Sequence, residues 1–248
     1  MDIKLIQAPL AGISDIVYRK LVRRYSKETL LTTEMISSEA LVNNQKTLII
    51  EYDKCEYPLS FQLSGHKPHI MAKAAKFLNQ RASSIDLNFG CPVNKVVKGT
   101  DGAAMMRNPK LASEIVKAIK DVISVPLSAK FRLGWSQDEM NFIEFAKILE
   151  GAGVDFITVH GRTRSQMYSG SADWEKIAQL KGEIKIPYFA NGDIKTLDDA
   201  LKCLEITGAN GISIGRGLMG DPKLAGRIEH YLKTGEKLKT PDLAEKIE

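Results

Sequence analysis

The chain has 248 residues, of which 44% are hydrophobic and 26% charged, and these proportions are typical of an ordinary globular protein. It contains no run of about 18 apolar residues, which argues against a membrane partner. Its first residues, "MDIKLIQAPL", lack the layout of a signal peptide. The formal net charge of +5 permits contact with a polyanion without requiring it.

Three cysteines stand far apart in the sequence: Cys55, Cys91 and Cys203. An odd number of isolated cysteines suits a reducing, cytoplasmic environment better than a disulfide framework. Neither a CxxC pair nor a Cys/His cluster is present in the sequence. We therefore expect no structural metal site.

Short β-rich runs alternate with amphipathic helical segments along nearly the whole chain. In "PKLASEIVKAIKDVI", for example, apolar residues recur every four positions, as on one buried helix face. In chain order, the pattern predicts strand 4–9, helix 14–25, strand 30–35, strand 58–64, helix 69–80, strand 84–89, helix 109–123, strand 126–133, helix 140–153, strand 156–160, strand 186–191, helix 196–208 and strand 211–215.

Strand–helix alternation predicts parallel strands joined by right-handed crossovers. Eight such repeats in about 230 residues favour a TIM (β/α)8 barrel. The alternative is an open doubly wound sheet, which usually carries GxGxxG after its first strand, and this sequence lacks that motif. We therefore predict an α/β barrel domain over residues 1–232 and a polar C-terminal tail over residues 233–248.

Barrel enzymes collect their chemistry at the C-terminal ends of the strands. Lys130 lies inside a predicted strand, where an unpaired ammonium is costly, so we interpret it as a ligand for an anion or a polarised carbonyl. The segments "ANGDI" and "ISIGRGLMG" accompany the last two strands, where such barrels often bind phosphate. Gly192, Gly215 and Gly217 would permit close backbone approach beside Arg216, although glycines also simply form tight turns.

The stretch "NFGCPVNKVVKGTDGAAM" places Cys91 at the start of a loop. A free cysteine is most often a small buried hydrophobe. A position between Gly90 and Pro92 suits that role poorly, so we favour a chemical role for this thiol.

Eight stretches of the sequence follow one another in an order shared with a known enzyme family. They are "APLAGISD", "TEMISSEAL", "FQLSG", "IDLNFGCPVNKVVKGTDGAAMMRNP", "AKFRLGW", "TVHGRTRSQMYSGSADW", "ANGDI" and "IGRGLMGDP", and they cover residues 8–222. On these stretches the chain resembles the tRNA-dihydrouridine synthases, flavoenzymes that reduce selected uridines in tRNA. The pair "NFGCPVNKV" and "HGRTR" is the most specific part of the resemblance.

The resemblance implies FMN as cofactor and NADPH as reductant. It also implies that hydride passes from reduced FMN to C6 of uracil, that Cys91 donates the proton to C5, and that Asn88 touches the uracil ring. A cysteine suits the acid role because its ordinary pKa of about 8.5 keeps it protonated at neutral pH. The implied flavin contacts are Pro9, Leu10, Ala11, Gln62, Lys130, His160, Asn191, Gly192, Asp193, Gly215 and Arg216.

A uridine stacked in folded tRNA reaches the flavin only after turning out of the stack, which costs a few kcal/mol. Basic residues on segments predicted at the rim would bind phosphates and offset that cost, although single lysines there are equally well explained as solvated surface. Tyr168 and Trp135 are candidates to line the uridine pocket by stacking, with packing an equal alternative for Trp135. The basic rim residues are Lys95, Lys98, Arg107, Arg132, Arg162 and Arg164.

Two features depart from the family pattern. Leu10 replaces the usual methionine after the first strand, a change of similar volume that should leave the flavin site intact. Family members usually continue into a C-terminal helical domain, and too few residues follow the predicted barrel here for a second core. We expect either a naturally short form or a fragment, and the target uridine stays open.

Two other functions stay open from the sequence. One is an FMN-dependent dehydrogenase or reductase of free pyrimidines, which would share the flavin and an Asn-x-x-Cys-Pro-like segment; "HGRTR" and the basic rim favour tRNA instead. The other is a catalytically silent tRNA-binding protein, against which the presence of Cys91, Lys130 and His160 argues.

Overall fold

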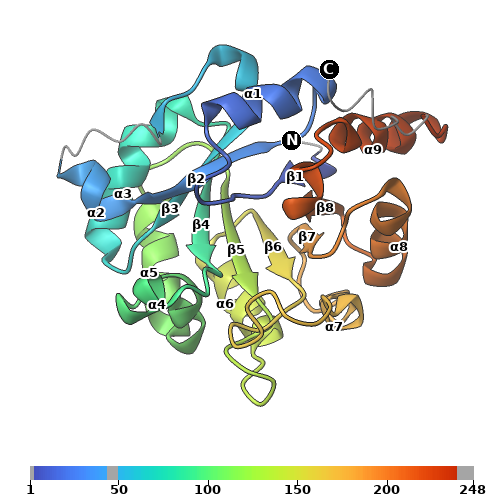
Figure 1. Ribbon diagram of the computed structural model, residues 1–248. Helices are drawn as coiled ribbons and strands as arrows, with labels where there is room; N and C mark the ends of the chain where they lie inside the picture. The colour runs from blue at the N-terminus through green and yellow to red at the C-terminus, as the bar shows by residue number, and fades with distance from the viewer. Residues whose placement is uncertain (1–2, 44–49, 239–248) are drawn as a thin grey trace.

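A computed structural model describes residues 3–43 and 50–238, which form a (β/α)8 barrel (Figure 1). Eight parallel strands pair in the order β1-β8-β7-β6-β5-β4-β3-β2. A bridge between Ile6 and Leu30 brings β1 beside β2 and closes the ring. The predicted TIM barrel is thus confirmed. The strands are β1 (Leu5–Gln7), β2 (Leu31–Ser37), β3 (Leu59–Ser64), β4 (Ser84–Phe89), β5 (Leu127–Arg132), β6 (Phe156–His160), β7 (Tyr188–Asn191) and β8 (Gly211–Ile214).

Helices surround the ring of strands (Figure 1). In the described ranges, none of them is both long and apolar enough to cross a membrane. The α-helices are α1 (Ile16–Tyr25), α2 (Ser38–Val42), α3 (Pro68–Leu78), α4 (Asn94–Lys98), α5 (Pro109–Lys120), α6 (Phe142–Ala152), α7 (Trp174–Ala178), α8 (Leu197–Thr207) and α9 (Lys223–Thr234). Short 3-10 helices include η2 (Lys54–Glu56), η4 (Gly102–Arg107) and η5 (Arg216–Leu218).

Strand β4 shows how the alternation of residue types builds the barrel. Ile85, Leu87 and Phe89 are buried in the hydrophobic core that joins the strands to the helices. Asp86 and Asn88 alternate with them and line cavities inside the ring. The barrel interior is therefore unusually polar, since such interiors are normally filled by Val, Ile and Leu.

The predicted strands and helices all overlap elements of the structure. The helices missed from the sequence include α2, α4 and α7, which have five residues each and are too short to display an apolar stripe. Helix α9 runs to Thr234 and so crosses the predicted domain boundary at residue 232. That boundary stays a prediction, and residues 239–248 of the predicted tail lie outside the described residues.

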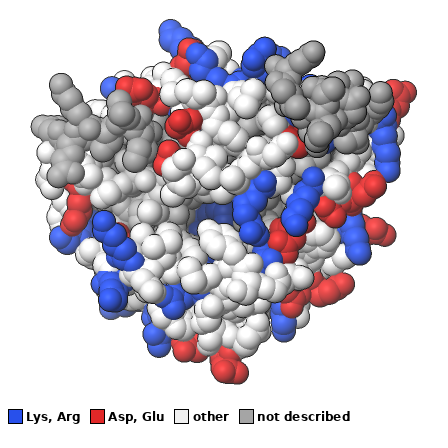
Figure 2. All heavy atoms as spheres, in the orientation of Figure 1, with Lys and Arg blue, Asp and Glu red and all other residues white. Residues whose placement is uncertain are grey.

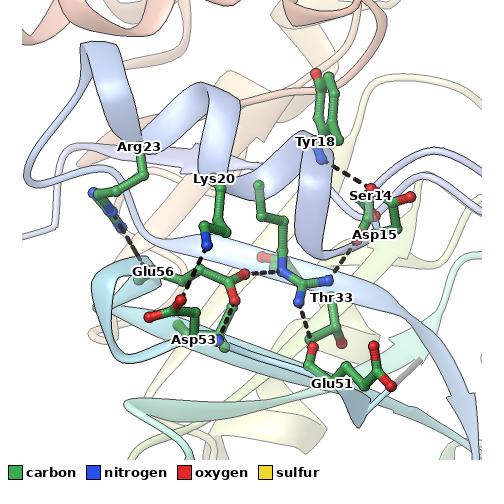
Figure 3. A network of polar contacts seen from close by, with 12 residues as sticks. Ser14, Asp15, Tyr18, Lys20, Arg23, Thr33, Glu51, Asp53 and Glu56 are labelled. Atoms are coloured by element: carbon green, nitrogen blue, oxygen red, sulfur yellow. Dashed lines mark hydrogen bonds and ion pairs between the residues drawn. The ribbon is translucent and has the colours of Figure 1, made fainter. Parts of the chain in front are cut away.

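A buried ion pair joins α1 to η2, the 3-10 helix just before β3 (Figure 3). Arg19 Nε donates to Glu56 at 2.6 Å, and the two side chains are only 1% and 0% exposed. The rest of the Arg19 guanidinium donates to the carbonyls of Ser14 (2.7 Å) and Glu51 (2.8 Å). Ser14 in turn accepts from the backbone of Leu10, so this network fixes the loop after β1.

Candidate active site

The C-terminal ends of the strands surround a cavity of about 560 Å³, which is within the usual range for cofactor sites. Figure 2 shows Lys and Arg side chains in and beside a recess near the centre of the face drawn. The cavity brings together most of the residues predicted from the sequence, and their individual roles stay predictions. Those that line it are Pro9, Leu10, Ala11, Gln62, Asn88, Cys91, Lys130, Arg132, His160, Tyr168, Asn191, Gly192, Asp193, Gly215, Arg216 and Gly217.

Lys130 lies near the end of β5 and lines this cavity. In the described part of the chain, its ammonium makes no hydrogen bond or ion pair. Burial, and then the neighbouring charge of Arg132, lower the pKa of Lys130 to about 8. An anion or a polarised oxygen would replace the water that this cation has lost on burial, so the site favours binding of such a group.

His160 ends β6 and is buried against Arg162. Its Nε2 lies 3.3 Å from Arg162 Nη1, and because a guanidinium only donates, Nε2 accepts and the ring proton sits on Nδ1. Burial, followed by the charges of Lys130, Arg132, Arg162 and Arg216, holds the pKa of His160 well below its ordinary value. The ring is therefore neutral at neutral pH and offers a hydrogen-bond donor at Nδ1.

Asp193, in the loop after β7, holds Arg162 in this position. Arg162 Nη2 donates to both carboxylate oxygens, at 2.9 and 2.7 Å. The N–H of Ala172 donates to the same carboxylate at 2.7 Å. Although burial acts to raise it, these donors hold the pKa of Asp193 below its ordinary value. The loops after β6 and β7 are thus tied together by an ionised carboxylate.

The loops after β7 and β8 line the cavity with glycine-rich backbone. No hydrogen bond within the described residues uses the N–H of Gly192, Asp193, Gly215, Arg216 or Gly217. The two loops approach closely because Gly217 has no Cβ; one added there would lie 2.1 Å from the carbonyl oxygen of Ile194. These free donors, with the Arg216 guanidinium, suit a phosphate group.

Cys91 is half-buried at the cavity wall just after β4. Its N–H donates to Asn88 Oδ1 at 2.9 Å, and its carbonyl accepts from Ala103 N at 3.0 Å. Gly102 packs beneath it with φ +60°, and a Cβ there would lie 2.7 Å from the Cys91 carbonyl oxygen. The segment that follows the thiol is therefore folded back to support it.

A chain of amide hydrogen bonds leads from Cys91 into the barrel. Asn88 Nδ2 donates to Gln62 Oε1 at 2.7 Å, and Gln62 Nε2 donates to Asp86 at 2.6 Å. Ser128 Oγ donates to the other oxygen of Asp86 at 2.6 Å. Burial raises the pKa of Asp86. Asp86 was not predicted from the sequence, although a carboxylate at an inward position of a predicted strand was the signal that could have found it.

The predicted rim residues divide into exposed and buried groups. Tyr168 is 54% exposed and lies under the guanidinium groups of Arg132 and Arg216, and Lys95 is exposed on α4. Arg164 donates to Asn94 Oδ1 and lies 4.7 Å from the Trp135 ring, so it braces the rim.

Arg132 and Arg162 are buried, each only 2% exposed. Arg132 donates to the carbonyls of Gly90, Thr163 and Met167. Arg162 donates to those of Ser169 and Gly170 in addition to Asp193. Arg162 does not line the cavity, so its position favours holding the loops together rather than the phosphate or substrate contact predicted for it. Arg132 also holds these loops, but it lines the cavity, and its predicted ligand contact stays a prediction.

A TIM barrel with a thiol, an unpaired lysine and free backbone N–H groups around one cavity is typical of the barrel enzymes, and these groups suit an anionic ligand. The chain belongs to the dihydrouridine synthase family of oxidoreductases. The family model described as "Dihydrouridine synthase (Dus)" matches residues 6–248. Among the described residues, no group of three or more His, Cys, Asp or Glu side chains is placed to hold a metal ion.

Similar proteins agree with this membership. The chain is 46% identical to "Probable tRNA-dihydrouridine synthase 1" of Synechocystis sp., over 98% of this chain and 69% of that protein. It is 40% identical to "tRNA-dihydrouridine synthase B" of Pseudomonas aeruginosa, over 98% of this chain and 74% of that one. A solved 2-naphthoyl-CoA reductase complex superposes with a TM-score of 0.68 at 13% identity, covering 92% of this chain and 50% of that one, which shows the fold alone.

Proposed function

We propose that this protein is a cytoplasmic tRNA-dihydrouridine synthase, which reduces uridine in tRNA with FMN as cofactor and NADPH as reductant. The observation that carries the proposal is the meeting of the Cys91 thiol, the unpaired Lys130 ammonium and the free N–H groups of two loops around one cavity. The printed names of the relatives support the same reaction on tRNA.

The residues present fit FMN. The N–H groups of Gly192, Gly215 and Arg216 would receive its phosphate, and the Lys130 ammonium and the Gln62 amide would bind the oxygen-rich edge of its ring. Pro9, Leu10 and Ala11 would form an apolar wall beside the ring. When bound, FMN supplies the hydride for the reduction.

Saturating the C5–C6 bond of uracil takes one hydride and one proton, and Cys91 would supply the proton at C5. Its S–H bond breaks as the new C–H bond forms, and the thiolate then regains a proton from solvent. Asn88 and Gly102 fix the backbone on either side of Cys91, which holds the thiol at the cavity wall. A positioned general acid of this kind typically contributes about a hundredfold or more in rate.

The tRNA would lie across the rim of the cavity. Lys95 and Arg164 would contact phosphates, and Tyr168, exposed beside the opening, would stack on an unpaired base. The three cysteines are all free, in keeping with a reducing compartment.

The test is an NADPH-dependent assay on uridine-containing tRNA transcripts, with dihydrouridine mapped by position. The parent chain is expected to bind FMN and to form product at defined positions. Cys91→Ala should retain FMN and lose at least about 99% of the rate. Cys55→Ala, which removes an exposed thiol outside the cavity lining, is the matched control and should keep the parent rate. Bound flavin without product on any transcript would refute the proposal.

A further inference from the structure

The hydrogen-bonded chain that ends at Asp86 fixes the orientation of two side-chain amides. At one end, the N–H groups of Cys91 (2.9 Å) and Gly90 (3.2 Å) can only donate, so Asn88 turns its oxygen toward them. At the other end, Asp86 accepts from Gln62 Nε2 at 2.6 Å, so Gln62 turns its nitrogen inward. The two amides then meet with Asn88 Nδ2 donating to Gln62 Oε1, which is the only arrangement that agrees with the hydrogen bonds at both ends of the chain.

The fixed orientation decides what Asn88 presents to a ligand. An amide nitrogen carries two hydrogens, and Gln62 takes one of those on Asn88 Nδ2. The second hydrogen is left for the cavity, which Asn88 lines. The oxygen of Asn88 already accepts two N–H groups of the Cys91 loop. Asn88 therefore offers a ligand in the cavity a hydrogen-bond donor and no acceptor.

We propose that Asp86 is a positioning residue that, through Gln62, helps the N–H groups of Gly90 and Cys91 to hold Asn88 as a donor to a pyrimidine carbonyl, and so favours uracil over cytosine. This inference rests on the proposed function. Uracil carries a carbonyl at the ring position where cytosine carries an amino group, and an N–H donor pairs with the first and opposes the second. A site built around one such hydrogen bond discriminates by about tenfold or more.

Asp86 is buried, at 6% exposed, and its two hydrogen bonds come from the strands on either side of β4. An asparagine at position 86 would still accept from Gln62. Its nitrogen would face Ser128 Oγ, which would then accept and turn its own hydrogen toward the carbonyl of Ile85, 3.4 Å away. A leucine of similar size would offer nothing to Gln62. Asp86→Asn and Asp86→Leu thus separate hydrogen bonding from the loss of charge.

The first test reads stability and needs neither cofactor nor RNA. Asn88→Asp places an oxygen where Asn88 donates, so Gln62 must turn its nitrogen toward residue 88 and its oxygen toward Asp86. Asn88→Asp alone should therefore lower the urea midpoint. Adding Asp86→Asn to that variant should restore much of the lost midpoint, because an amide at position 86 can donate to the turned Gln62. Adding Asp86→Leu instead removes the same negative charge and should restore less of the midpoint. Equal recovery in the two double variants would overturn the claim that this chain of hydrogen bonds orients the amides.

The second test reads specificity by competition binding of two transcripts that differ only by uridine or cytidine at the mapped position. The parent should prefer the uridine transcript about tenfold. Asp86→Asn should keep that preference, Asp86→Leu should reduce it severalfold, and Asn88→Asp should reverse it. An unchanged preference in Asn88→Asp would overturn the specificity role even if the stability test succeeds. A parent that modifies no transcript would remove the proposed function and the specificity role together, leaving only the orienting chain.

Discussion

Lys130 is a partly buried cation with no ion-pair partner in the described chain, and its pKa is lowered to about 8. Because the unfolded chain holds that proton up to about pH 10.4, Lys130 destabilises the folded protein at neutral pH, and the penalty fades as pH rises from about 8 to about 10.5. Lys130→Met should therefore stabilise the flavin-free protein at pH 7, by up to about 3 kcal/mol, and by little at pH 10. Urea unfolding at both pH values measures this.

The same substitution should weaken FMN binding by about tenfold or more, because it removes the charge that faces the bound group. A flavin fluorescence titration separates this loss from the gain in stability. A variant that is less stable at pH 7 while binding FMN normally would contradict the role given to the lysine.

Gly102 supports Cys91 at a distance that no side chain allows. An added Cβ would meet the Cys91 carbonyl oxygen at 2.7 Å and the Cys91 Cβ at 2.9 Å, at a φ of +60°. Gly102→Ala should therefore displace the thiol and lower the rate of dihydrouridine formation by roughly a hundredfold while FMN binding is kept. Gly151→Ala, where the added Cβ meets nothing within 4 Å, is the control and should keep the parent rate.

Single residues were predictable from the sequence where their type conflicts with their setting. A lysine inside a strand and a cysteine between glycine and proline both stand out, and both line the cavity. Arg162 did not stand out as a buried residue, because its partner Asp193 lies 31 residues away on another loop. Only the packed barrel shows that this guanidinium is enclosed.

At the scale of elements, the contact between Arg162 and Asp193 joins the loops after β6 and β7. Asp193→Asn should leave Arg162 poorly paired and reduce the free energy of unfolding by about 2 kcal/mol at pH 7. The backbone is not strained further, since asparagine tolerates the Asp193 φ of +56°. Because the pKa of Asp193 is lowered on folding, its stabilisation is present above about pH 4 and is lost as pH falls.

Urea unfolding of the parent and Asp193→Asn should therefore converge below about pH 4. Glu183→Gln, which breaks the exposed pair with Lys147, is the matched control and should change stability little. A difference for Asp193→Asn that is independent of pH would speak against an ionised carboxylate as its origin.

Elements were predictable from the sequence where burial alternates over a whole strand or helix. "SIDLNF" places apolar residues toward the helices and polar residues inside the ring, and β4 has the predicted bounds. Helix α4 was missed because its five residues, none of them buried, carry no apolar stripe. Its place at the rim comes from Arg164, which donates to Asn94 and so ties α4 to the loop after β6. Contacts of this kind join residues 70 positions apart and leave no local pattern.

At the scale of the whole molecule, the positions of the exposed charges predict the affinity for tRNA better than the net charge of +5 does. Arg132 and Arg162 are buried and hydrogen-bonded to carbonyl groups, so they count toward the net charge without being exposed to a polyanion such as tRNA. Lys95, an exposed cation on the rim, is free to contact one. Affinity for tRNA should therefore depend on the position of a charge rather than on the total.

Two charge reversals of equal size test this. Lys95→Glu on α4 at the rim and Lys73→Glu on the outer helix α3 both lower the net charge by the same amount, and both lysines are exposed. Because each released counterion contributes about 0.9 to the slope of log affinity against log salt, Lys95→Glu should flatten that slope by about one and weaken tRNA binding several-fold at low salt. Lys73→Glu should leave the slope near that of the parent. Equal losses in the two variants would mean that tRNA is attracted by net charge alone, and the rim would lose its role as the binding face.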